Sequence, residues 1–272
     1  AMVKKSGLLE LIDTPASLND IGGLDVLKDY LLNKSRVIAD LPKAIDFGVS
    51  IPKGVFIVGM PGCGKSLCAK ASAALFNTPL LKLDMGSMMG KYVGESEGNL
   101  RKAIKIAEAA APCVLWIDEI EKAFSGVDGN NDIMTRMFGY FLSWMQEKKS
   151  CVYVIATANK IKDLPLELKR KGRFDEIFCV NLPNKEERKK IFKIHIGKKN
   201  KSLDEAALNS VCQITEGFNG ADIESVVNEA MEKCFIDSLD NKGTAFDGKL
   251  FKDIASKTIS ISESDKQQIE NM

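Results

Sequence analysis

The sequence contains a single histidine, and its seven cysteines form no C-x-x-C pair. A structural zinc site needs four closely spaced thiolate or imidazole ligands, so this composition argues against one. Most of the cysteines lie in apolar runs, which is typical of buried free thiols in a reducing compartment. We therefore expect a cytoplasmic protein without a disulfide framework.

A long apolar run and an excess of charge are also missing. No run approaches the roughly 18 apolar residues of a membrane-spanning helix, so we expect no membrane span. Lys and Arg number 38 against 37 Asp and Glu, for a net charge of +1. Nucleic-acid binders usually carry a basic excess, so this balance argues against nucleic acid as the partner. The lysine-rich stretch 189–201 is accordingly interpreted as a solvated helix face.

The sequence does contain a glycine-rich phosphate-binding pattern, GMPGCGKS, at residues 59–66. An apolar run precedes it and a helix-forming run follows, which is the strand–loop–helix context that such a loop needs. Its glycines let the backbone direct N–H groups at an anion, and the helix N-terminus adds positive charge. Lys65 is expected to reach the β- and γ-phosphates of a nucleotide, and Ser66 to offer an oxygen to Mg²⁺. The residues expected to contact the nucleotide are Pro61, Gly62, Cys63, Gly64, Lys65, Ser66 and Leu67.

Two acidic residues are candidates for metal binding and for activation of water, which the phosphate loop does not provide. Asp118 and Glu119 directly follow the apolar run 113–117, and the carboxyl end of a buried strand is where α/β folds place ligands. Asp118 is expected to hold Mg²⁺ opposite Ser66, and Glu119 to orient and polarise an attacking water. Asn159, at the end of the next apolar run, is predicted to fix that water or the γ-phosphate.

Five apolar runs separated by helical patterns predict an α/β domain with five strands. The runs lie at residues 54–58, 80–84, 113–117, 151–157 and 176–180. After Pro183 only helical patterns follow. We accordingly divide the chain into an N-terminal extension (1–19), an α/β domain (20–184), a helical subdomain (185–260) and a tail (261–272).

Together these motifs resemble the AAA ATPases over about residues 18–238. The similarity rests on the phosphate loop, on Ile117-Asp118-Glu119, on Asn159 and on two further strings, RKGRFD at 170–175 and GFNGADI at 217–223. The string at 111–122 resembles, more particularly, a poorly characterised group of bacterial and plastid-encoded reading frames with a C-terminal AAA module. The opening Ala1-Met2 is similar to a cloning remnant on an internal start, so we expect a module of a longer protein.

The resemblance implies a P-loop domain with a parallel five-stranded sheet of order 5-1-4-3-2, followed by a helical lid. It also implies a homo-oligomeric ring, a hexamer, in which Arg170 and Arg173 enter the neighbouring site as arginine fingers. Further nucleotide contacts are implied by similarity for four residues outside the phosphate loop: Asp20, Gly22, Gly220 and Ala221. His195 is implied in the same way as a nucleotide-side residue.

Residues Lys91, Tyr92 and Val93 resemble the pore loop of the family. An aromatic and an aliphatic side chain presented around a ring would grip an extended polypeptide without sequence preference. The alternative is that Tyr92 packs on the adjacent helix. The resulting prediction is an ATPase that couples turnover to remodelling of a protein substrate.

Several alternatives stay open at this point. They are a nucleic-acid-directed motor, an ATP-binding scaffold with little turnover, and a regulatory GTPase. The last is disfavoured because Lys162 stands where the guanine-reading motif Asn-Lys-x-Asp needs aspartate. Whether Cys63 makes the phosphate loop sensitive to oxidation is also left open.

Overall fold

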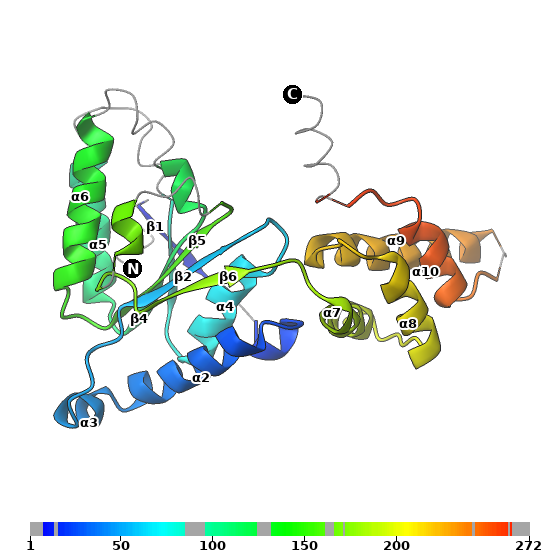
Figure 1. Cartoon of the computed structure of the whole chain (residues 1–272), viewed down its shortest axis with the longest axis horizontal. Coiled ribbons are helices and arrows are strands. Elements are labelled where there is room, and N and C mark those ends of the chain that lie inside the picture. The colour runs from blue at the N-terminus through cyan, green and yellow to red at the C-terminus, as the bar shows by residue number, and fades with distance from the viewer. Residues whose placement is uncertain are drawn as a thin grey trace. The chain divides into compact units, whose positions relative to one another are not determined.

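The computed structural model describes residues 8–13, 16–84, 96–123, 132–160, 166–170, 172–240, 243–260 and 262. By their internal contacts these residues divide into two compact units (Figure 1). The first comprises the described residues up to 18, 25–59 and 65–180, and the second comprises 19–24, 60–64 and those from 181 onward. Within the described ranges, no helix combines the length and apolar character needed to cross a bilayer.

The first unit is built on a six-stranded sheet in the order β1-β3-β4-β5-β2-β6. All pairs from β3 to β6 are parallel. Counted along the chain from β2, the five parallel strands lie in the order 5-1-4-3-2, as predicted. The strands are β1 (Leu9–Ile12), β2 (Gly54–Gly59), β3 (Leu80–Leu83), β4 (Cys113–Ile117), β5 (Val152–Ala158) and β6 (Glu176–Val180).

Strand β1 corrects the prediction of five strands, because residues 1–19 were assigned to an extension. It pairs antiparallel with β3, with Leu9 opposite Leu83 and Ile12 opposite Leu80. The sequence Leu-Glu-Leu-Ile alternates only over its first three residues, fewer than the about four to eight that indicate a strand, and only Leu9 is buried. The strand forms because β3 would otherwise leave an unpaired sheet edge.

Helices cover both faces of this sheet (Figure 1). On one face, α5 (Ser96–Ala109) and α6 (Asp132–Glu147) share a buried apolar cluster with residues of strands β2, β3, β4 and β5. On the other, α4 (Lys65–Leu75) contacts β4 and β5, and α2 (Asp25–Ala39) contacts α4. The central strands are therefore buried on both faces, which is why their sequences are continuously apolar. The other elements described before residue 181 are helix α3 (Leu41–Asp46) and the short 3₁₀ helices η1 (Leu18–Asp20), η3 (Ile120–Ala123) and η4 (Leu166–Lys169).

The second unit contains the helices α7 (Lys185–Gly197), α8 (Glu205–Ile214), α9 (Gly220–Leu239) and α10 (Gly248–Ala255). They enclose an apolar core of their own, which includes Phe192, Val211 and Phe251. Each helix begins after an Asn or Asp whose side chain accepts a hydrogen bond from a backbone N–H of the first turn, an arrangement that typically stabilises a helix by about 1 kcal/mol. These caps are Asn184, Asp204, Asn219 and Asp247.

Candidate active site

The loop between β2 and α4 needs glycine at two positions. Gly62 and Gly64 have φ angles of 76° and 84°, in the left-handed region that other residues rarely adopt. Gly62 also lies against Asn219, the residue before α9, which belongs to the same second unit. A Cβ added to Gly62 would be 2.6 Å from the side-chain amide of Asn219. That amide donates to the Pro61 carbonyl oxygen (3.1 Å), and the Gly220 N–H donates to the Gly62 oxygen (2.9 Å). Both the backbone angle and the available space therefore require glycine at position 62.

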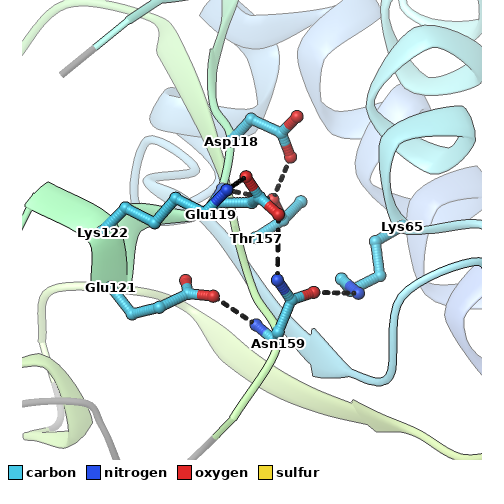
Figure 2. Close-up of polar contacts among 7 residues, drawn as sticks. All are labelled: Lys65, Asp118, Glu119, Glu121, Lys122, Thr157 and Asn159. Atoms are coloured by element: carbon cyan, nitrogen blue, oxygen red, sulfur yellow. Dashed lines mark hydrogen bonds and ion pairs between the residues drawn. The ribbon is translucent and has the colours of Figure 1, made fainter. Parts of the chain in front are cut away.

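Lys65, the first residue of α4, is a buried cation with 7% of its surface exposed. Its Nζ donates to the Gly59 carbonyl oxygen at 2.6 Å and to Asn159 Oδ1 at 3.0 Å. The lysine thus connects the end of β2 with the residue after β5; Figure 2 shows its contact with Asn159. A buried ammonium at a helix N-terminus is well suited to offset phosphate charge.

The two acidic residues after β4 are held by a hydroxyl of the next strand. Thr157 is fully buried in β5, and its Oγ1 donates to Asp118 Oδ1 at 2.6 Å. The same oxygen accepts a hydrogen bond from the Glu119 N–H at 3.1 Å. Glu119 has a φ of 47°, an uncommon angle for a residue with a side chain. Thr157 therefore fixes both the Asp118 carboxylate and the backbone turn that presents Glu119.

Asn159 lies at the centre of the remaining contacts (Figure 2). Its Nδ2 donates to Glu119 Oε1 at 3.0 Å, while its Oδ1 accepts from Lys65. Its backbone N–H donates to Glu121 Oε1 at 2.8 Å. The structure thus brings together Lys65, Glu119 and Asn159, which the sequence places far apart, and Thr157 links Asp118 to the same group. Their catalytic and metal-binding roles stay predictions.

Glu119 also forms an ion pair with Lys122, whose Nζ lies 2.5 Å from Glu119 Oε2. The hydrogen bond from Lys122 lowers the pKa of Glu119; desolvation opposes this shift, and Asn159 and Lys65 add to it. The same hydrogen bond raises the pKa of Lys122. The side chain of Glu119 is therefore held as a carboxylate at neutral pH.

Ser66 and Asp118 fit the metal that the sequence predicts. Ser66 is the second residue of α4, directly after Lys65, and its side chain is half-buried. Hydroxyl and carboxylate oxygens are ligands that Mg²⁺ prefers. With the buried ammonium of Lys65, this donor set suits a nucleotide phosphate together with Mg²⁺.

Sequence reasoning missed Thr157, Glu121 and Lys122. Thr157 carried a usable signal, since it is a polar residue inside an apolar strand and a buried hydroxyl requires a partner. Lys122 stands three residues after Glu119, a spacing that brings side chains together only if the intervening residues form a helical turn. That turn is η3, which the sequence did not predict.

The two predicted arginine fingers lie in the segment before β6. Arg170 is exposed, and the Arg173 guanidinium donates to the Glu167 carbonyl oxygen. The segment is anchored by Asp175, whose Oδ2 accepts from the N–H groups of residues 53 and 54 at 2.9 and 3.2 Å. Phe174 is buried and stacks on Phe56, with ring centroids 5.4 Å apart. The finger role concerns a neighbouring subunit and stays a prediction.

Leu67 lies in α4, and the predicted nucleotide contacts outside residues 59–67 lie in the second unit, several of them around α7. Asp20 Oδ1 is 2.9 Å from Lys198 Nζ, directly after that helix. Gly22 packs so closely on α7 that an added Cβ would be 2.4 Å from Ile191 Cγ1. His195 is on the same helix, with Nδ1 3.9 Å from Glu224 Oε1, and burial lowers its pKa. Gly220 and Ala221 are the first two residues of α9.

The predicted pore loop, Lys91, Tyr92 and Val93, lies outside the described residues.

Comparison with known families gives two matches along the chain. Residues 55–182 match the family described as "ATPase family associated with various cellular activities (AAA)". Residues 205–245 match the family described as "AAA+ lid domain". The first matched segment covers most of the first unit together with residues 60–64 and 181–182 of the second, and the other matched segment lies within the second unit.

Similar proteins include an uncharacterized AAA domain-containing protein, ycf46, of Pyropia yezoensis, which is 42% identical over the whole of this chain and 54% of its own length. The ycf46 protein of Guillardia theta is 46% identical over 86% of this chain and 46% of its own length. The chain thus spans about half the length of these curated relatives. The crystal structure of the FIGL-1 AAA domain has the same fold, with a TM-score of 0.77 at 21% identity, covering 98% of this chain and 91% of that one.

Proposed function

The chain belongs to the AAA family of ATPases, and from this premise we propose that it binds ATP with Mg²⁺ and hydrolyses the nucleotide. The observation that carries the proposal is the contact network from Lys65 through Asn159 to Glu119, with Asp118 held beside it by Thr157. Phosphoryl transfer depends mostly on positioning and charge neutralisation, and these groups supply both.

Each residue of the network has a distinct proposed task. Lys65 would hold the β- and γ-phosphates, and Ser66 with Asp118 would hold Mg²⁺, which neutralises charge on the phosphate oxygens when bound. Glu119, kept ionised by its neighbours, would accept a hydrogen bond from the attacking water. Asn159 would keep the Glu119 carboxylate directed into the site.

We further propose that turnover takes place in a ring of identical subunits, a hexamer in a cytoplasmic setting. By their resemblance to the family's arginine fingers, Arg170 and Arg173 would complete the neighbour's site. Asp175, anchored to residues 53 and 54, would hold the segment before β6 in place. The work done is proposed to be remodelling of a protein substrate gripped by Lys91, Tyr92 and Val93. Support comes from a relative, the ATP-dependent zinc metalloprotease FtsH 2 of Salinibacter ruber, 32% identical over 83% of this chain and 34% of its own length.

The test of hydrolysis is Glu119→Gln, with Glu147→Gln at an exposed position of α6 as the matched control. Glu119→Gln should bind fluorescent ATP with near wild-type affinity and lose about 10²–10⁴ in turnover, since the amide cannot act as a base. Glu147→Gln should match the wild type in both assays. Turnover by Glu119→Gln within a factor of three of the wild type would place the catalytic base elsewhere.

The test of substrate class compares ATP turnover of the full-length protein with an unfolded polypeptide and with single-stranded DNA. Stimulation by the polypeptide that is lost in Tyr92→Ala, with basal turnover retained, is the expected result. Stimulation by DNA alone would favour the nucleic-acid-directed motor instead.

A further inference from the structure

Both oxygens of the Glu119 carboxylate are engaged in the structure. Oε1 accepts the Asn159 amide at 3.0 Å, and Oε2 lies 2.5 Å from Lys122 Nζ (Figure 2). Glu119 and Lys122 stand at the two ends of a single turn that closes with a backbone hydrogen bond from the Lys122 N–H to the Glu119 carbonyl oxygen, at 2.9 Å. The ion pair is therefore built into the local geometry of η3.

We propose that Lys122 is a positioning residue that restrains ATP turnover by holding Glu119 Oε2 in an ion pair. The inference rests on the proposed function, because the restraint acts on the residue assigned to activate water. An oxygen that accepts a short hydrogen bond from an ammonium is a poorer acceptor for water. The backbone of Glu119 is fixed by Thr157, so the carboxylate can be redirected only by changing its contacts with Asn159 or Lys122.

The pair is placed so that it can open. The Lys122 side chain is 67% exposed and that of Glu119 is 38% exposed, so water and ions compete for both charges. Lys65, Asn159, Glu119 and Lys122 also form one continuous chain of contacts. A movement of the Lys65 ammonium can therefore shift the Glu119 carboxylate, because the side-chain amide of Asn159 is hydrogen-bonded to both.

Two other carboxylates, Glu121 and Asp118, also attract Lys122, but more weakly than Glu119 does. Asp118 accepts the Thr157 hydroxyl, and Glu121 Oε1 accepts the backbone N–H of Asn159. Glu119 is therefore the main partner of Lys122. The size of the restraint follows from exposure, since an exposed ion pair typically changes an equilibrium by a factor of about 1.5 to 5.

Kinetics of Lys122→Met test the restraint. The change removes the charge and keeps the length of the side chain, and we expect kcat for ATP to rise about twofold to fivefold with KM within a factor of two. Lys122→Arg keeps the charge and should keep most of the restraint. Lys105→Met, at an exposed position of α5, removes the same charge elsewhere and should leave kcat unchanged. In a Glu119→Gln background, Lys122→Met should have no further effect, because the neutral amide forms no ion pair.

A second measurement examines the pair without nucleotide. The Nζ group of Lys122, observed by ¹⁵N NMR in the free protein, should be less mobile in the wild type than in Glu119→Gln. Equal mobility in the two proteins overturns the inference on its own. An unchanged or lower kcat in Lys122→Met also overturns it, since Lys122 would then have no effect on Glu119 or would support it. If NMR shows that the Lys122–Glu119 ion pair is present but the wild-type protein hydrolyses no ATP, the proposed function is refuted, and the restraint with it.

Discussion

Thr157→Val removes one hydroxyl from the centre of the candidate site and keeps the shape of the side chain. In β5 this hydroxyl donates to Asp118 Oδ1 at 2.6 Å and accepts from the Glu119 N–H at 3.1 Å. The residue is fully buried, so water cannot replace the hydroxyl. Valine therefore leaves an acceptor and a donor without their partner.

The magnitude follows from these two bonds. A hydrogen bond to a charged group contributes about 1.5–3 kcal/mol, and a buried N–H left without a partner costs about 1–3 kcal/mol. Burying a methyl group in place of the hydroxyl offsets about 1 kcal/mol of the loss. We expect a net loss of about 3 kcal/mol in the free energy of unfolding, or a fall of about 6–12 °C in Tm for a domain of this size.

Thermal unfolding and ATP turnover are the two assays, with Thr157→Ser as the matched control. Serine keeps both hydrogen bonds and loses a methyl group, which costs about 1 kcal/mol. Thr157→Val should also lower kcat, because Glu119 has a φ of 47° and its backbone N–H loses its anchor. Serine should retain most of the turnover.

The reasoning fails if valine at position 157 is as stable as serine there. Equal melting temperatures would mean that neither hydrogen bond stabilises the fold. A stability loss of the expected size with unchanged turnover would separate the two claims, because Thr157 would then support the strand without orienting Glu119.

Three further predictions follow from the same structure. Lys65→Met should abolish measurable binding of fluorescent ATP, because it removes the buried cation expected to offset the phosphates; affinity equal to the wild type would contradict the phosphate-loop assignment. Arg173→Ala should keep nucleotide binding and lower turnover by about 10³–10⁵, and mixing it with Glu119→Gln subunits should restore part of the activity through intact shared sites; assembled mixtures without recovery would argue against the arginine finger. Burial lowers the pKa of Lys148 to about 8, so between about pH 8 and 10.5 the unfolded chain binds more protons than the folded one. The stability of the wild type relative to Lys148→Met should therefore rise by about 2–3 kcal/mol across this window in urea unfolding, and a constant difference would show that Lys148 is not desolvated.

The sequence by itself determined the glycine-rich loop before Lys65 and the five parallel strands, since both signals are local. Glycine spacing before Lys65 reflects backbone angles, as the φ values of Gly62 and Gly64 show. Strands buried on both faces must be continuously apolar, so β4 and β5 were visible as runs. The order of these strands came from resemblance to the AAA family rather than from the runs themselves.

Only the tertiary structure decided β1 and the partners of Glu119. β1 has one buried residue and exists because β3 offers an open edge, a property of the assembled sheet. The contacts of Glu119 with Asn159 and of Asp118 with Thr157 join residues about 40 positions apart, and they form because parallel strands β4 and β5 end at the same edge. Lys122 is near in sequence, yet its ion pair depends on the turn that begins at the positive φ of Glu119. Residue types therefore predicted the candidate catalytic residues. The pairing of neighbouring strands and the turn after β4 determined which side chains contact them.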